Sequence, residues 1–121
     1  MFTISKEFHF SASHQLLCMP EDHPCARMHG HNYVVEVELQ RKTLDETGFV
    51  KDYHALDALK VYIDETFDHR HINDVLGHDQ ATAEQLAKHF YIWSKERWPE
   101  VSAVRVRETP KTCAEYRPRN A

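Results

Sequence analysis

The residues best able to do chemistry lie in one short segment, in which Cys25 is followed by His29, Gly30 and His31. His29 and His31 are two residues apart, so their side chains share a face if this segment enters a β-strand. Two neutral imidazoles side by side are suited to zinc or a similar ion. For an isolated pair of this kind, two hydrogen-bonded core or loop histidines remain the alternative.

A strand predicted over residues 2–14 supplies a third candidate ligand. Its apolar residues alternate with polar ones, which is the period of a half-buried strand, and His14 continues the apolar face. A second strand, predicted over residues 31–41, has its apolar residues in the same parity as His29 and His31. If the two strands pair, three histidines meet with one ligand position open. That pattern is typical of a catalytic zinc site rather than a closed structural one.

Four further side chains are candidates for acid–base or binding roles. Cys25, beside the histidine pair, could act as a base or nucleophile when it is a thiolate, and an inert small hydrophobe is the alternative. Asp68 precedes His69 and could fix the tautomer of an imidazole, although surface pairs of this kind are common. Glu108 has the parity of the apolar residues before it. It could match a ligand with two parallel N–H groups, or it could have reached solvent at the end of a strand.

Elements that could position these side chains follow in the order ββααββ. Asp52 is a plausible N-cap of a helix that extends to about Phe67, and the spacing of Thr82 and Gln85 is that of a capping box before a second helix. Pro99 follows the second helix. A closing hairpin is predicted over residues 102–108 and 112–117. Loops are predicted over residues 15–28 and 69–80. We therefore expect an α+β fold, with two helices on one face of a four-stranded antiparallel sheet, in a single domain over residues 1–121.

Composition narrows the classes of partner. The formal net charge is −4, so no basic surface argues for nucleic acid, and no apolar run approaches the length of about 18 residues that crosses a membrane. The N-terminus has no apolar signal core, so a cytoplasmic location is expected. The three cysteines form no C-x-x-C pair, which is consistent with a reducing compartment.

Five short motifs together resemble the 6-pyruvoyltetrahydropterin synthase and 6-carboxytetrahydropterin synthase superfamily. They occur in the family order and span nearly the whole chain: Phe10-Ser11-Ala12-Ser13-His14, Cys25-x-x-x-His29-Gly30-His31, Asp68-His69, Thr82-Ala83-Glu84 and Arg107-Glu108-Thr109. The resemblance implies the tunnelling fold, in which subunits join their sheets into barrels, commonly as a homohexamer of two stacked trimers with sites at subunit interfaces. The three residues between Cys25 and His29 resemble the bacterial carboxytetrahydropterin enzymes of queuosine biosynthesis.

The resemblance also implies a role for each candidate residue. Zinc would be bound by His14, His29 and His31, Cys25 would be the catalytic base, Asp68 and His69 would form the relay, and Glu108 would anchor the pterin ring. The implied reaction is a lyase step that converts 7,8-dihydroneopterin triphosphate into 6-carboxy-5,6,7,8-tetrahydropterin, acetaldehyde and triphosphate. An enzyme that makes 6-pyruvoyltetrahydropterin and a non-catalytic zinc- or pterin-binding module are the alternatives.

Overall fold

A four-stranded antiparallel sheet is the frame of the protein. The computed structural model describes residues 1–17 and 19–119, so Cys18 lies outside the described residues. The strands lie in the order β1-β2-β3-β4, each antiparallel to its neighbour. Their bounds are β1 Phe2–His14, β2 His29–Arg41, β3 Val101–Arg107 and β4 Ala114–Tyr116. All four predicted strands are present, although β4 is shorter than the predicted residues 112–117.

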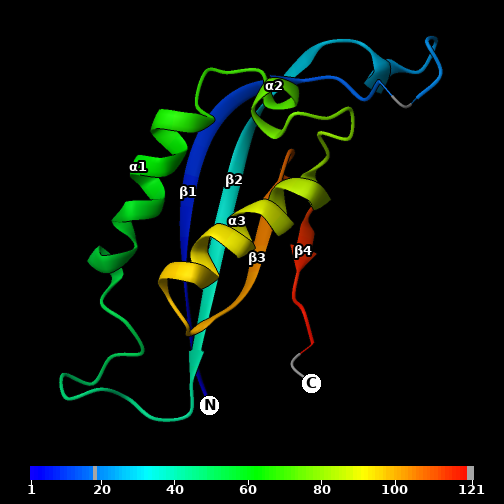
Figure 1. Cartoon of the computed structure of the whole chain (residues 1–121). Coiled ribbons are helices and arrows are strands. Elements are labelled where there is room, and N and C mark those ends of the chain that lie inside the picture. The colour runs from blue at the N-terminus through cyan, green and yellow to red at the C-terminus, as the bar shows by residue number, and fades with distance from the viewer. Residues whose placement is uncertain (18, 120–121) are drawn as a thin grey trace.

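Helices cover one face of this sheet, as Figure 1 shows for α1 and α3. The helical segments are the 3₁₀ turns η1 Pro24–Ala26 and η2 Tyr53–Leu56, and the α-helices α1 Asp57–Thr66, α2 Ile72–Leu76 and α3 Ala83–Arg97. None of the helices in the described parts of the chain is long and apolar enough to cross a membrane. The predicted α+β fold class, with helices on one face of an antiparallel sheet, is confirmed.

The helix boundaries differ from the sequence prediction in two places. Asp52 does cap a helical segment, because its side chain accepts from the backbone N–H of His54, but the segment begins as the 3₁₀ turn η2. The short helix α2 lies within residues 69–80, which were predicted to be a loop. It ends at Gly77, whose φ of 76° is readily adopted only by glycine. The predicted cap at Thr82 is confirmed, since its hydroxyl accepts from the N–H of Gln85.

The apolar core lies between the sheet and the helices, and the alternation along β1 and β2 determines which side chains enter it. Tyr33, Val35, Val37 and Leu39 of β2 are fully buried, and Phe8, Phe10 and Ala12 of β1 are nearly so. His14 belongs to the same face and is only 2% exposed. His9, which has the opposite parity, is exposed as predicted. The core face therefore continues directly into the histidines at one end of the sheet.

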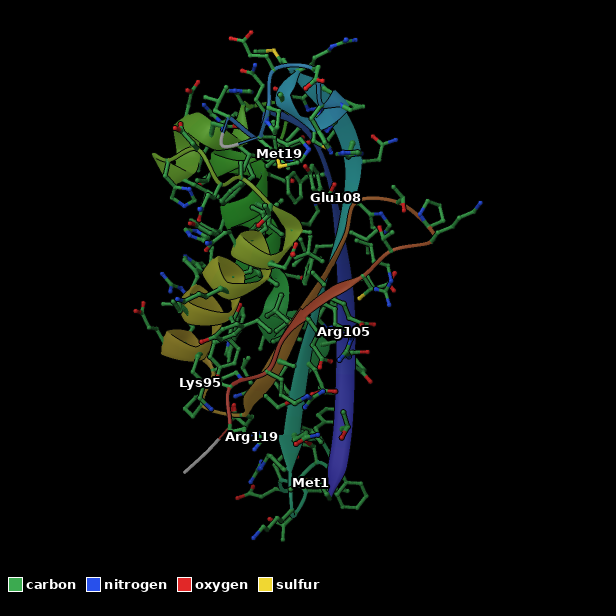
Figure 2. All side chains as sticks on the ribbon, turned by 90° about the vertical axis from the view of Figure 1, so that its right-hand side faces the viewer. Met1, Met19, Lys95, Arg105, Glu108 and Arg119 are labelled. Atoms are coloured by element: carbon green, nitrogen blue, oxygen red, sulfur yellow. The ribbon has the colours of Figure 1, made fainter. Side chains whose placement is uncertain are left out.

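The other face of the sheet carries charged side chains. Arg105 pairs with Glu36, Glu38 and Glu115, and Arg117 also pairs with Glu38. Figure 2 shows Arg105 on the side of the sheet away from the helices, about midway along it. Glu108 lies near the end of the sheet where Met19 and the β1–β2 connection are found, and Met1 lies at the opposite end. The candidate site is thus at the connection end of the sheet.

Candidate metal centre

Strand pairing brings together the three histidines predicted as metal ligands. In the register of β1 and β2, His14 lies opposite His29, and Ala12 lies opposite His31. Partners in an antiparallel pair share a face, so all three imidazoles are on the side that carries the core. One ring nitrogen from each histidine lies within 4.8 Å of the corresponding nitrogens of the other two. The prediction that these side chains converge is confirmed.

Backbone carbonyls fix the orientation of two of the rings. Nδ1 of His14 lies 2.6 Å from the carbonyl oxygen of Ala81, and Nδ1 of His29 lies 2.7 Å from that of Arg27. A carbonyl can only accept, so each Nδ1 carries the proton and donates it. In the neutral rings both Nε2 atoms then present lone pairs, and these two atoms are 2.9 Å apart. Two facing lone pairs repel unless a proton or a cation lies between them, so the donor set fits a metal ion.

Burial favours the neutral form of His14, which is the form that binds a metal. Removal of the ring from water lowers the pKa of His14, and the nearby imidazoles of His29 and His31 act in the same direction. The Ala81 carbonyl and the Glu108 carboxylate oppose this shift without cancelling it. Because the imidazole is neutral near pH 7, metal binding at this ligand need not displace a proton.

Glu108 reaches the same site from the end of β3. Its Oε2 lies 3.2 Å from Nε2 of His31, although the alignment is not that of a hydrogen bond, and His31 Nε2 is otherwise buried without a partner. Glu108 is not a member of the group of three converging ligand atoms. The predicted inward direction of Glu108 is therefore confirmed, and its carboxylate lies beside the metal ligands.

Tyr33 is a residue of the site that sequence reasoning assigned only to the core. It follows His31 by two residues on the same face, and its ring lies 5.5 Å from that of His31. The side chain is fully buried, yet no described protein group forms a hydrogen bond with its hydroxyl. Burial and the charge of Glu108 both raise the pKa of Tyr33, so the hydroxyl keeps its proton. The parity of Tyr33 with His31 is the one sequence signal that could have indicated its position.

Asp68 and His69 form a pair against the edge of β1. Asp68 Oδ1 accepts from the N–H of Ser11 at 3.0 Å, and Asp68 Oδ2 lies 2.9 Å from Nδ1 of His69. The Ser11 N–H, followed by His69, lowers the pKa of Asp68. His69 has a φ of 58°, and it is the only residue other than glycine with a positive φ in the described part of the chain. Its N–H donates to the carbonyl of Ser11 at 2.6 Å. Its imidazole is left largely exposed, with Nδ1 held by the carboxylate.

Cys25 lies in the 3₁₀ turn η1. Its N–H donates to Nδ1 of His23, and its carbonyl accepts from the N–H of Leu16. Its thiol is half-buried, and it is not among the converging metal ligands. Within the described chain, no hydrogen bond or ion pair joins Cys25 to Asp68 or His69. The predicted thiol and the predicted relay are therefore not in hydrogen-bonded or ionic contact within the described residues.

Comparison with known proteins identifies the family. The family model described as 6-pyruvoyl tetrahydropterin synthase matches residues 3–119. The chain belongs to the 6-pyruvoyl tetrahydropterin synthase family. A family relative from Synechocystis, named 6-carboxy-5,6,7,8-tetrahydropterin synthase, is 34% identical, with 96% of this chain and 93% of the relative covered. A relative of the same name from Bacillus subtilis is 31% identical over 98% of this chain and 86% of its own length.

A solved structure from the same family has the same architecture. The 6-pyruvoyl tetrahydropterin synthase of Caenorhabditis elegans superposes with a TM-score of 0.84 and 26% sequence identity, covering 98% of this chain and 96% of that protein. The resemblance that the five sequence motifs indicated is thereby confirmed.

Proposed function

We propose that this protein is a zinc-dependent lyase that converts 7,8-dihydroneopterin triphosphate and one water into 6-carboxy-5,6,7,8-tetrahydropterin, acetaldehyde and triphosphate, as a step of queuosine biosynthesis in the cytoplasm. The observation that supports it most is the convergence of His14, His29 and His31, with Nδ1 of two of them held by backbone carbonyls, in a chain of this family. Relatives that bear the 6-carboxy name, and the short spacer between Cys25 and His29, favour this product over the 6-pyruvoyl one.

Each group of residues has a separate task in this proposal. Zinc held by the three histidines would supply Lewis-acid polarisation of the side-chain oxygens of the substrate. Glu108 binds the paired N–H edge of the pterin ring, because a carboxylate matches two parallel donors in bidentate fashion. The position of Glu108 beside His31 supports a binding mode in which the ring lies next to the metal ligands. The ring is thereby oriented so that its side chain meets the reacting groups.

Proton transfer is assigned to Cys25 and to the Asp68–His69 pair. Cys25 takes a proton from the activated side chain of the substrate, and His69 relays protons while Asp68 holds Nδ1. No hydrogen bond or ion pair joins Cys25 to this pair in the described part of the chain, and we propose that the groups meet across a subunit interface. The edge of β4, and that of β1 before the Ser11–Ser13 stretch that residues 68–71 cover, would allow such an assembly by sheet extension, as a homohexamer of two trimers.

The test is an incubation of the zinc-loaded protein with 7,8-dihydroneopterin triphosphate, with the products identified by mass spectrometry. Formation of 6-carboxy-5,6,7,8-tetrahydropterin and acetaldehyde is expected. Formation of 6-pyruvoyltetrahydropterin would instead support the closest alternative enzyme. Binding of the pterin without turnover would contradict the lyase proposal and support a non-catalytic zinc- and pterin-binding module.

A pair of cysteine variants separates the catalytic thiol from a general effect of removing thiols. Cys25→Ala is expected to keep its zinc and its pterin binding while turnover falls by about 10²-fold or more, the typical value of a positioned acid or base. Cys113→Ala is the matched control, because Cys113 is exposed and outside the site. Turnover by Cys25→Ala close to that of Cys113→Ala would exclude Cys25 as the base.

A further inference from the structure

The turn that carries Cys25 is the 3₁₀ segment η1, and the side chain of His23 caps its start. Nδ1 of His23 accepts the backbone N–H of Cys25 at 3.0 Å. A ring nitrogen that accepts carries no proton, so in the neutral imidazole the hydrogen is on Nε2. At the other end of the turn, the N–H of Arg27 donates to the carbonyl of Pro24. Hydrogen bonds therefore close η1 at both ends.

The turn η1 is also connected to both backbone carbonyls that orient metal ligands. The carbonyl of the residue that ends η1 lies 2.7 Å from Nδ1 of His29. The carbonyl of Cys25 accepts from the N–H of Leu16 at 2.8 Å. Leu16 forms a bridge with Gln80, and the next residue supplies the carbonyl that orients His14. A displacement of η1 would therefore move the Cys25 backbone relative to the metal ligands.

Histidine is not a common cap, and its charge gives a reason for its presence here. The turn η2 is capped by a bond of the same kind from a carboxylate, since Asp52 accepts from the N–H of His54 at 2.9 Å. A carboxylate at position 23 would place a negative charge two residues from Cys25, and that charge would disfavour the thiolate that the proposed reaction requires. A neutral imidazole accepts the same hydrogen bond without the charge.

We propose that His23 is a positioning residue, whose neutral ring fixes the turn that presents the Cys25 thiol to the metal centre. The proposal rests on the proposed function, in which Cys25 is the base. His23 acts through the backbone of Cys25 and does not itself exchange a proton with the substrate. The effect on the reaction can be large, because a displacement of about 1 Å at a reacting group can cost about 10²-fold in rate.

The test measures how fast iodoacetamide alkylates Cys25 in the zinc-loaded protein. Cys18 and Cys113 are replaced by alanine in every sample, so that one thiol remains. The Cys25 thiol is half-buried, so its reaction rate depends on how often the turn opens. Loss of a cap should raise the population of the open turn about fivefold, which corresponds to about 1 kcal/mol. His23→Ala is therefore expected to raise the alkylation rate about fivefold.

Two further variants separate the cap from other effects of the substitution. His23→Asn keeps an uncharged acceptor for the N–H two residues on, and it should react at about the wild-type rate. Asp52→Ala is the matched control, because it removes the corresponding bond at the start of η2. It should lower Tm about as much as His23→Ala does and leave the alkylation rate of Cys25 unchanged.

Turnover of dihydroneopterin triphosphate is the second measurement, made with Cys18 and Cys113 in place. His23→Ala should lower kcat by about tenfold or more and leave KM nearly unchanged, because the thiol acts on substrate that is already bound. His23→Asn should restore kcat. An unchanged alkylation rate in His23→Ala, or an equal rise in Asp52→Ala, would overturn the proposal. Failure of His23→Asn to restore the wild-type rates would also overturn it, because the cap would then not be the cause.

Failure of this proposal can be told apart from failure of the proposed lyase function, because alkylation needs no substrate. If alkylation of Cys25 depends on the cap but the wild type converts no pterin, the role of His23 in holding the thiol is supported and the lyase proposal fails. If the wild type is an active lyase and His23→Ala has normal kcat and normal alkylation, only the positioning role fails.

Discussion

Replacement of His29 by alanine tests the metal centre most directly. His29 is only half-buried, whereas His14 lies in the core, so its loss should leave the packing intact. The variant removes one of three converging nitrogens and the contact of 2.9 Å between the two Nε2 atoms. The remaining pair should bind zinc too weakly for it to persist through purification.

The magnitude follows from mass action. A ligand that binds only the folded state stabilises it by about 2.7 kcal/mol at 100 times its dissociation constant. For a domain of this size, about 1 kcal/mol shifts Tm by roughly 3–6 °C, so zinc at that excess should raise the Tm of the wild type by roughly 10 °C. Under the same conditions His29→Ala should show a much smaller shift. The metal-free variant should be close to the metal-free wild type, because the bond that His29 makes to the Arg27 carbonyl is exposed.

The assay is thermal unfolding followed by circular dichroism, with and without added zinc, together with metal analysis of each purified protein. His9→Ala is the matched control, since His9 lies on the same sheet but on its exposed face. It should keep the full shift. An equal zinc-induced shift and equal zinc content in His29→Ala and wild type would refute the reasoning, because the metal would then be held elsewhere.

Three more substitutions test other parts of the site and the core. Glu108→Gln should weaken pterin binding by about tenfold or more and leave the zinc content unchanged. The expected loss is on the scale of one charged hydrogen bond, roughly 1.5–3 kcal/mol. Loss of zinc with normal pterin binding would instead assign Glu108 to the metal. Tyr33→Phe should maintain or raise the free energy of unfolding in urea, by up to about 1 kcal/mol, because it removes a buried hydroxyl that has no protein partner, and a clear loss of stability would reveal a bond to that hydroxyl. His89 Nε2 lies 2.6 Å from the hydroxyl oxygen of Tyr62, and burial lowers the pKa of His89 below the ordinary value of 6.5. Because its pKa for His89 is higher, the unfolded chain takes up the proton first, so the free energy of unfolding should fall as the pH drops from about 7.5 to about 5.5. His89→Gln should reduce that fall. An equal fall in the variant and the wild type would contradict the assignment to His89.

Much of the site could be predicted because strand periodicity is local information. The alternation of apolar and polar residues along residues 2–14 and 31–41 assigned His14, His29 and His31 to the core face before any contact was known. Side chains two residues apart in a strand share a face whatever the partner strand is. The predicted face of each histidine is therefore correct even where the predicted end of the strand is off by a few residues. The same argument gave the inward direction of Glu108, which the contact with His31 confirms.

Other features had no signal in the sequence. Helix α2 has only five residues, and it is held by the segment that packs along β1 rather than by its own periodicity. The carbonyl of Ala81, which fixes the ring of His14, belongs to the backbone, and every residue has such a group. The N–H of Ser11, which donates to Asp68 from 57 residues away, is also a backbone group that every residue except proline has. Bonds of this kind depend on where distant segments pass.

The sequence by itself determined which residue types are available and which face of a strand each one occupies, because these follow from composition and from the period of two. Only the tertiary structure decided that His14 lies opposite His29 and which ring nitrogens face the centre. The register depends on how residues 15–28 connect the two strands, and ring orientation depends on carbonyls brought from elsewhere. Both are consequences of packing between segments distant in the chain.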